Sequence, residues 1–158
     1  MSEQYISILE DSLKKKVQVF DEIIAKNEEQ KKILEPEEFD MDAFDVNTQE
    51  KGELIDKLNL LDSGFEKVYD RVKEELSEGR EKYAEQIRRM QDLIRQITEK
   101  SVLIQTTEER NRKIIEGKFR KEREKIQLGK NSMKVAKQYY NTMNKLTAVQ
   151  PHFLDNKK

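Results

Sequence analysis

The chain has two prolines, Pro36 and Pro151, and a long interval without proline lies between them. Proline removes a backbone donor and clashes with the preceding helical turn, so a segment without it can form long continuous helices. The apolar residues of this interval recur three and four positions apart, the spacing of one helix face. We therefore predict an all-α fold: an elongated antiparallel helical bundle or coiled coil of about three long helices plus a short C-terminal helix. Two apolar stripes carry this prediction: Leu54, Leu58, Leu61, Phe65, Val68, Val72 and Leu76, and then Tyr83, Ile87, Met90, Ile94 and Ile97.

The composition suits a slender bundle with little interior. Charged residues make up 40% of the 158 residues and hydrophobic residues 35%, as expected when most of each helix faces water. The absence of cysteine excludes a disulfide scaffold and a thiolate metal site. The N-terminus lacks the basic start of a signal peptide, and no apolar run approaches the roughly 20 residues of a membrane span. We expect a cytoplasmic protein.

Acidic and basic residues are concentrated in different halves of the chain. Residues 1–79 hold 11 Lys and Arg against 22 Asp and Glu, a net charge of −11, whereas residues 80–158 hold 20 against 10, a net charge of +10. The halves could form separate surfaces for two partners. We favour the interpretation that the acidic half folds back on the basic half, because opposite charges beside a helical seam favour one register.

Breaks in the periodic pattern divide the chain into segments. We predict helices over residues 2–34, 46–76 and 80–128. Gly79 could be a weak point in one continuous helix, but we favour a chain reversal there because the sign of the charge also changes. Residues 1–129 would form the bundle and residues 130–158 a C-terminal amphipathic tail after Gly129. The inward face of the first helix is expected to be Ile6, Leu9, Leu13, Val17, Phe20 and Ile24.

The segment 35–46 contains six acids and no base. We predict a loop or short turn whose Phe39, Met41 and Phe44 tuck against the bundle. Its acids lack the alternating ligands, central glycine and late glutamate of a calcium loop, so we expect no metal site.

The apolar stripe of the third helix turns polar at Ser101, Glu108 and Asn111. Polar residues in a seam often fix its register at a cost in stability, but they could also mark where a neighbouring helix stops covering the seam. The basic stretch 118–130 follows. We interpret it as a solvated helical extension, because aromatic residues are not interleaved as base-stacking platforms.

The tail differs in composition from the bundle. It is rich in Met, Tyr, Asn and Gln, and residues 131–158 contain one acid, Asp155. An isolated helix of this length is marginal in water, so the tail either docks on its own bundle or folds when it binds a partner. One apolar helical face is formed by Ala136, Tyr139, Met143 and Leu146, with Met133, Val135 and Tyr140 at its margins.

Catalytic signatures are missing from the sequence. His152 is the only histidine and has no triad or metal partner near it, and no dinucleotide, P-loop or zinc-protease motif occurs. We expect no enzymatic activity and no cofactor.

Four features of the chain form a recognisable pattern: the first amphipathic helix with its acidic segment, the leucine-rich stretch Gln49–Leu76, the Asn-Arg and apolar pair within Glu108–Phe119, and the ending that runs from Tyr139, Tyr140 and Met143 to Phe153–Lys158. In these features the chain resembles FlgN-type flagellar export chaperones. The resemblance covers the whole length, although the basic stretch 118–130 has no role in it that we can assign.

The resemblance implies a chaperone that binds hook–filament junction (hook-associated) proteins, prevents their premature assembly and delivers them for type III export. Components of the export apparatus and a second copy of the chain are further candidate partners. A structural homodimeric coiled coil without cargo is the alternative, and a nucleic-acid-associated protein using residues 112–130 is a weaker one. Since the C-terminal region is associated with cargo in that family, the implied partner-binding residues are Met133, Val135, Ala136, Tyr139, Tyr140, Met143 and Leu146.

Overall fold

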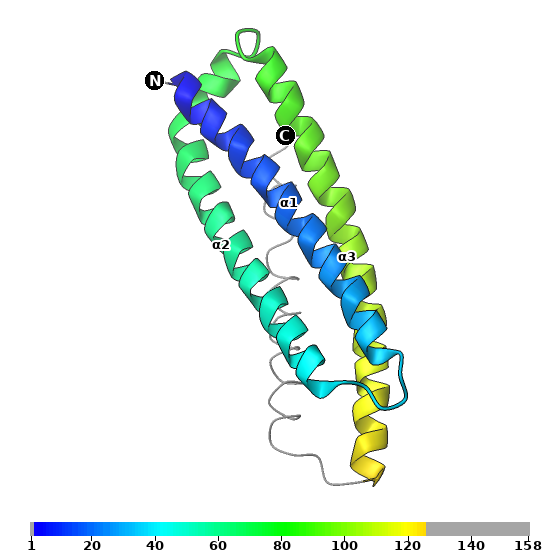
Figure 1. Ribbon diagram of the computed structural model, residues 1–158. Helices are drawn as coiled ribbons and strands as arrows, with labels where there is room; N and C mark the ends of the chain where they lie inside the picture. The colour runs from blue at the N-terminus through cyan, green and yellow to red at the C-terminus, as the bar shows by residue number, and fades with distance from the viewer. Residues whose placement is uncertain (1, 126–158) are drawn as a thin grey trace.

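The computed structural model describes residues 2–125, which form three long helices (Figure 1). Helix α1 spans Ser2–Leu34, α2 spans Met41–Glu78 and α3 spans Ala84–Lys125. The described residues contain no strand, and the predicted all-α bundle is confirmed. α1 packs against both other helices; α2 runs antiparallel to it, and α3 returns parallel to it. The predicted C-terminal helix, and the predicted end of the third helix at residue 128, lie outside the described residues.

The core is a long apolar seam to which all three helices contribute. The predicted face of α1 is buried at four positions and half-buried at Val17 and Ile24. Val19 and Ile23, which lie beside this face, are also buried. The buried face of α1 is wider than predicted because the helix contacts two neighbours on different sides. The stripes of α2 and α3 are buried or half-buried throughout, at Leu54, Leu58, Leu61, Phe65, Val68, Val72, Leu76, Tyr83, Ile87, Met90, Ile94 and Ile97.

The predicted boundary of the acidic loop is wrong, because α2 begins at Met41 rather than at residue 46. Asp40 caps the helix: its backbone is extended, and its side chain accepts a hydrogen bond from the Ala43 N–H at 3.2 Å. The loop is therefore confined to residues 35–40. The apolar residues of the predicted segment do tuck against the bundle: Phe39 in the loop and Met41 at the start of α2 are half-buried, and Phe44 in α2 is fully buried.

The chain reverses at Gly79, as predicted. The Gly79 N–H donates to the Glu75 carbonyl at 2.7 Å and closes α2. A Cβ on Gly79 would lie 3.0 Å from that carbonyl oxygen and 3.3 Å from the Tyr83 ring, so glycine fits this close approach. The turn is longer than predicted because α2 continues to Glu78 and α3 begins at Ala84.

A layer of polar side chains separates the main apolar core from a second apolar cluster at the end distant from this turn, formed by Leu34, Phe44, Ile115 and Phe119. The three polar seam positions of α3 are all buried. Asn111 donates from Nδ2 to the Asn27 carbonyl at 2.9 Å and to Gln30 Oε1 at 3.0 Å, and Asn27 donates to Thr107 Oγ1 at 2.8 Å. The seam therefore stays covered at these positions, and the alternative that its cover ends there is wrong.

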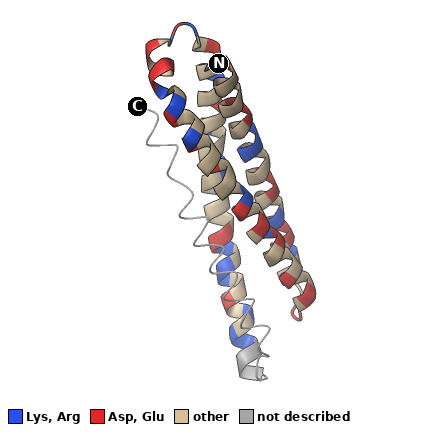
Figure 2. Ribbon diagram, turned by 90° about the vertical axis from the view of Figure 1, so that its left-hand side faces the viewer, with Lys and Arg blue, Asp and Glu red and all other residues tan. Residues whose placement is uncertain are grey.

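Charged pairs join the acidic and basic halves of the chain. On α1, Glu10 accepts from Arg89 of α3 at 2.9 Å, and Asp21 accepts from Lys100 at 2.5 Å. A third pair, Arg110 with Glu28 at 2.9 Å, lies farther along the same two helices. Figure 2 shows that Lys and Arg positions and Asp and Glu positions occur along the helices of the bundle. The interpretation that the two halves pair is thus supported, although these pairs join the parallel helices α1 and α3.

A candidate partner-binding groove

The tail residues for which we predicted partner binding lie outside the described residues, and the structure brings none of them into a site. They are Met133, Val135, Ala136, Tyr139, Tyr140, Met143 and Leu146. Within the described part of the chain, the candidate site is a groove between α2 and α3, close to the Gly79 turn.

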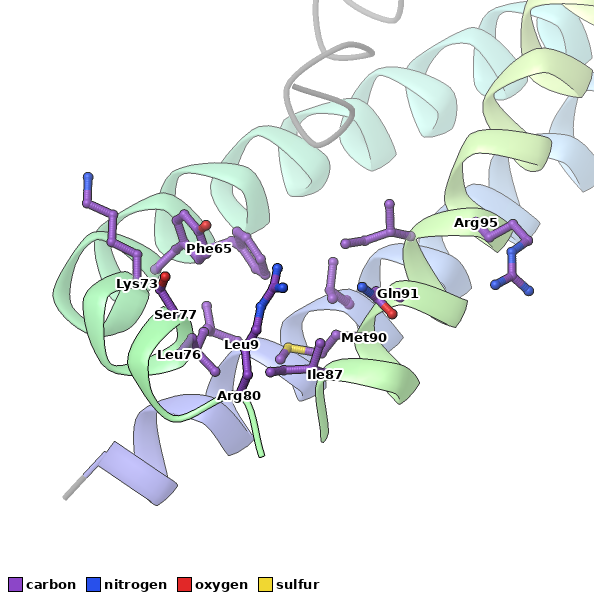
Figure 3. A pocket seen from close by; sticks show the side chains of 13 residues that line it. Leu9, Phe65, Lys73, Leu76, Ser77, Arg80, Ile87, Met90, Gln91 and Arg95 are labelled. Carbon is purple, nitrogen blue, oxygen red and sulfur yellow. The ribbon is translucent and has the colours of Figure 1, made fainter. Parts of the chain in front are cut away.

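The groove has an apolar floor and apolar walls, and its volume is about 400 Å³ (Figure 3). Leu9 and Leu13 of α1 form the floor. Aromatic and aliphatic side chains form the walls, and the ring of Phe65 stacks on that of Tyr69 at a centroid distance of 6.0 Å. The walls are Phe65, Tyr69 and Leu76 of α2 and Ile87, Met90 and Ile94 of α3. This surface can hold an apolar side-chain stripe.

The groove exists because α1 packs against both α2 and α3. Met90 and Ile97 of α3 are buried, whereas Ile87 and Ile94 are only half-buried, because α1 covers one side of the stripe. Sequence reasoning assigned the whole stripe to a closed seam and missed the groove. The width of the α3 stripe, with Ile87 and Ile94 beside Met90 and Ile97, was the available signal.

Every charged side chain that lines the groove is basic: Lys73, Arg80 and Arg95. Lys73 lies 3.5 Å from Asp70 and Arg95 lies 2.7 Å from Asp92, each on its own helix. Arg80 forms no ion pair with any residue between 2 and 125. Exposed pairs of this kind contribute little, so the mouth of the groove favours an anionic partner.

Other kinds of site were sought over the same described range. Residues 2–125 contain no group of His, Cys, Asp or Glu side chains that could hold a metal ion. None of the three helices is long and apolar enough to cross a membrane. The described surface therefore offers the groove as its main candidate for binding.

A family model described as FlgN protein matches residues 1–146. The chain belongs to the FlgN family. Members of this family are flagellar export chaperones, so the chain has a chaperone role in flagellar assembly. No curated protein and no solved structure matches the chain. The family match extends beyond the described bundle and includes the predicted apolar face of the tail.

Proposed function

We propose that this FlgN-family chain is a cytoplasmic, non-enzymatic chaperone that binds hook–filament junction proteins and presents them for type III export. The observation that carries this proposal is the family match over residues 1–146. A chaperone of this kind holds an export-competent chain and blocks the surfaces through which that chain would polymerise. Such surfaces are often amphipathic helices, which bind to a matching apolar face.

We place the cargo contact on the tail, over residues 132–146. Its single apolar face follows helical spacing, and its composition differs sharply from that of the bundle. Met and Tyr supply adaptable apolar contacts. A segment that becomes ordered on binding loses conformational entropy, so we expect micromolar rather than picomolar affinity. The face consists of Met133, Val135, Ala136, Tyr139, Tyr140, Met143 and Leu146.

Calorimetry with a purified hook-associated protein tests this proposal. Replacing Tyr139 and Met143 together by serine should weaken binding by about 2–4 kcal/mol if both are buried anchors. The matched control replaces Gln138 and Asn141, which lie off the apolar face at 100° per residue, by serine. Absence of binding by the unmodified chain would contradict the proposed function. Equal losses in both double variants would contradict only the placement on this face.

A further inference from the structure

We propose that the groove between α2 and α3 is a second helix-binding site, and that it takes an acidic amphipathic helix from a partner protein. This site is built from residues of α1, α2, α3 and the Gly79 turn. The proposal is supported by the shape of the groove, by the charge at its mouth, and by the charge of the chain beyond Lys125.

The shape of the groove matches one helix. α1 packs against α2 and against α3, and its Leu9 and Leu13 form the floor between them. A fourth helix laid over this floor would contact α2 and α3 on the side opposite α1, which is the arrangement of a four-helix bundle. The apolar walls supplied by Phe65, Leu76 and Ile94 would then cover an apolar stripe with spacing of three and four residues.

The basic side chains at the mouth of the groove favour a helix that carries acidic side chains. Figure 3 shows Arg80 reaching from the turn into the space between α2 and α3, while Lys73 and Arg95 lie at the outer edges. A carboxylate beside the apolar stripe of an incoming helix could accept two hydrogen bonds from the Arg80 guanidinium. A lysine at the same place would instead be repelled by the Arg80 guanidinium. The preference for an acidic helix therefore follows from the groove itself.

The chain's own amphipathic tail does not match this groove in charge. Residues 131–158 carry Asp155 as their single acid against five lysines, which are Lys134, Lys137, Lys145, Lys157 and Lys158. A second copy of the chain is also a poor occupant, because a two-fold interface centred on the groove would bring two copies of the same basic mouth together. A helix from a different protein, with acidic flanks, matches the charge of the groove.

The experiment uses the full-length chain and two synthetic helical peptides of about 18 residues, long enough to be helical. Both peptides carry the same leucine stripe; one has Glu and the other Lys at the flanking positions. Fluorescence anisotropy measures the affinity of each. We expect the acidic peptide to bind at least tenfold more tightly than the basic one. Equal affinities, or tighter binding of the basic peptide, would overturn the proposal.

Charge-reversal variants locate the binding. Arg80→Glu should weaken binding of the acidic peptide about tenfold or more. The matched control is Arg88→Glu, since Arg88 is an exposed arginine on α3 that does not line the groove. Its effect should be less than about threefold. If Arg80→Glu and Arg88→Glu weaken binding equally, the acidic peptide is attracted to the basic half of the chain in general. That result would overturn the proposed site.

Thiol protection tests the position directly, because the chain contains no cysteine of its own. Ser77 lines the groove and is exposed, whereas Ser63 is exposed on α2 outside it. The acidic peptide should slow modification of Ser77→Cys and leave Ser63→Cys unaffected. Without peptide, Ser77→Cys should react equally fast in the full chain and after deletion of residues 130–158, at every protein concentration. Slower reaction in the full chain would assign the groove to the tail, and slowing with concentration would assign it to a second copy; either result overturns the proposal.

Discussion

The Nζ atom of Lys51 on α2 lies 2.6 Å from Oε1 of Glu108 on α3, and both side chains are buried in the bundle. Burial lowers the pKa of the Lys51 ammonium, and the adjacent Glu108 carboxylate opposes that shift. The pair joins two helices that otherwise pack mainly through α1. It lies in the polar layer between the two apolar clusters, where the Asn111 and Asn27 hydrogen bonds also lie.

Breaking this pair should destabilise the bundle strongly. Glu108→Gln leaves a buried cation without its carboxylate, which should cost about 3–5 kcal/mol in a urea unfolding experiment. Replacing both residues by apolar ones, Lys51→Met with Glu108→Leu, should restore most of that stability, because neither charge then loses its hydration. If the double variant is as unstable as Glu108→Gln, the ion pair itself stabilises the fold. The loss in Glu108→Gln is then not explained by the buried Lys51 ammonium alone.

The apolar seam should not tolerate a charge. Leu58 is fully buried, whereas the next residue, Asn59, is exposed. Leu58→Asp should lower the free energy of unfolding by about 4 kcal/mol or more, since a lone carboxylate would replace core contacts. Asn59→Asp adds the same charge and should change stability by less than about 0.5 kcal/mol. Similar melting temperatures for the two variants would mean that the buried face of α2 is assigned wrongly.

Three aromatic rings tie the α1–α2 loop to the last turns of α3. Phe39, Phe44 and Phe119 contact one another edge to face at centroid distances of 5.9–6.1 Å. Phe44→Ala should cost about 3–5 kcal/mol because its ring is fully buried. Phe39→Ala should cost clearly less, since Phe39 is half-buried. Thermal unfolding checks the order of the two losses, and the reverse order would contradict the described packing.

The Glu10–Arg89 pair predicts a dependence of stability on pH. Hydrogen bonds from Arg89 lower the pKa of the Glu10 carboxyl below its usual 4.5. A carboxyl with a lowered pKa in the folded state stabilises the fold above its unfolded pKa, and this contribution is lost as pH falls through the folded pKa.

At pH 7, Glu10→Gln should therefore lose about 1 kcal/mol, a small amount because Arg89 is half exposed. The difference from the unmodified chain should shrink as the pH falls below about 4.5. The control is Glu3→Gln, since Glu3 is exposed. Chemical denaturation at several pH values measures this, and a constant difference would be incompatible with the lowered pKa.

The periodic apolar pattern was sufficient to predict the helices and most of the core. Stripe residues such as Leu58 and Met90 are buried because helices of this composition have few other apolar positions to bury. Boundaries were predicted less well. Asp40 acts as an N-cap three residues before Ala43, and the density of acids around it concealed that local signal.

The groove and the buried ion pair could not be predicted from the pattern. The apolar pattern of one helix shows which residues avoid water. It does not show which of two neighbouring helices covers each residue, or which residues are left uncovered. Ile87 and Ile94 look like core residues in the sequence and instead line an open groove. Lys51 looks like a surface residue, and only the position of Glu108 on another helix explains its burial.

The central claim is that this FlgN-family chain binds hook–filament junction proteins through its tail. Calorimetry of a purified hook-associated protein with the full chain, and with a variant lacking residues 130–158, tests it most directly. The bundle core is built within residues 2–125, so the variant should keep its helical circular dichroism signal. We predict micromolar binding by the full chain and loss of binding by the deletion variant. Undiminished affinity of the deletion variant would contradict the account and place the cargo site on the bundle.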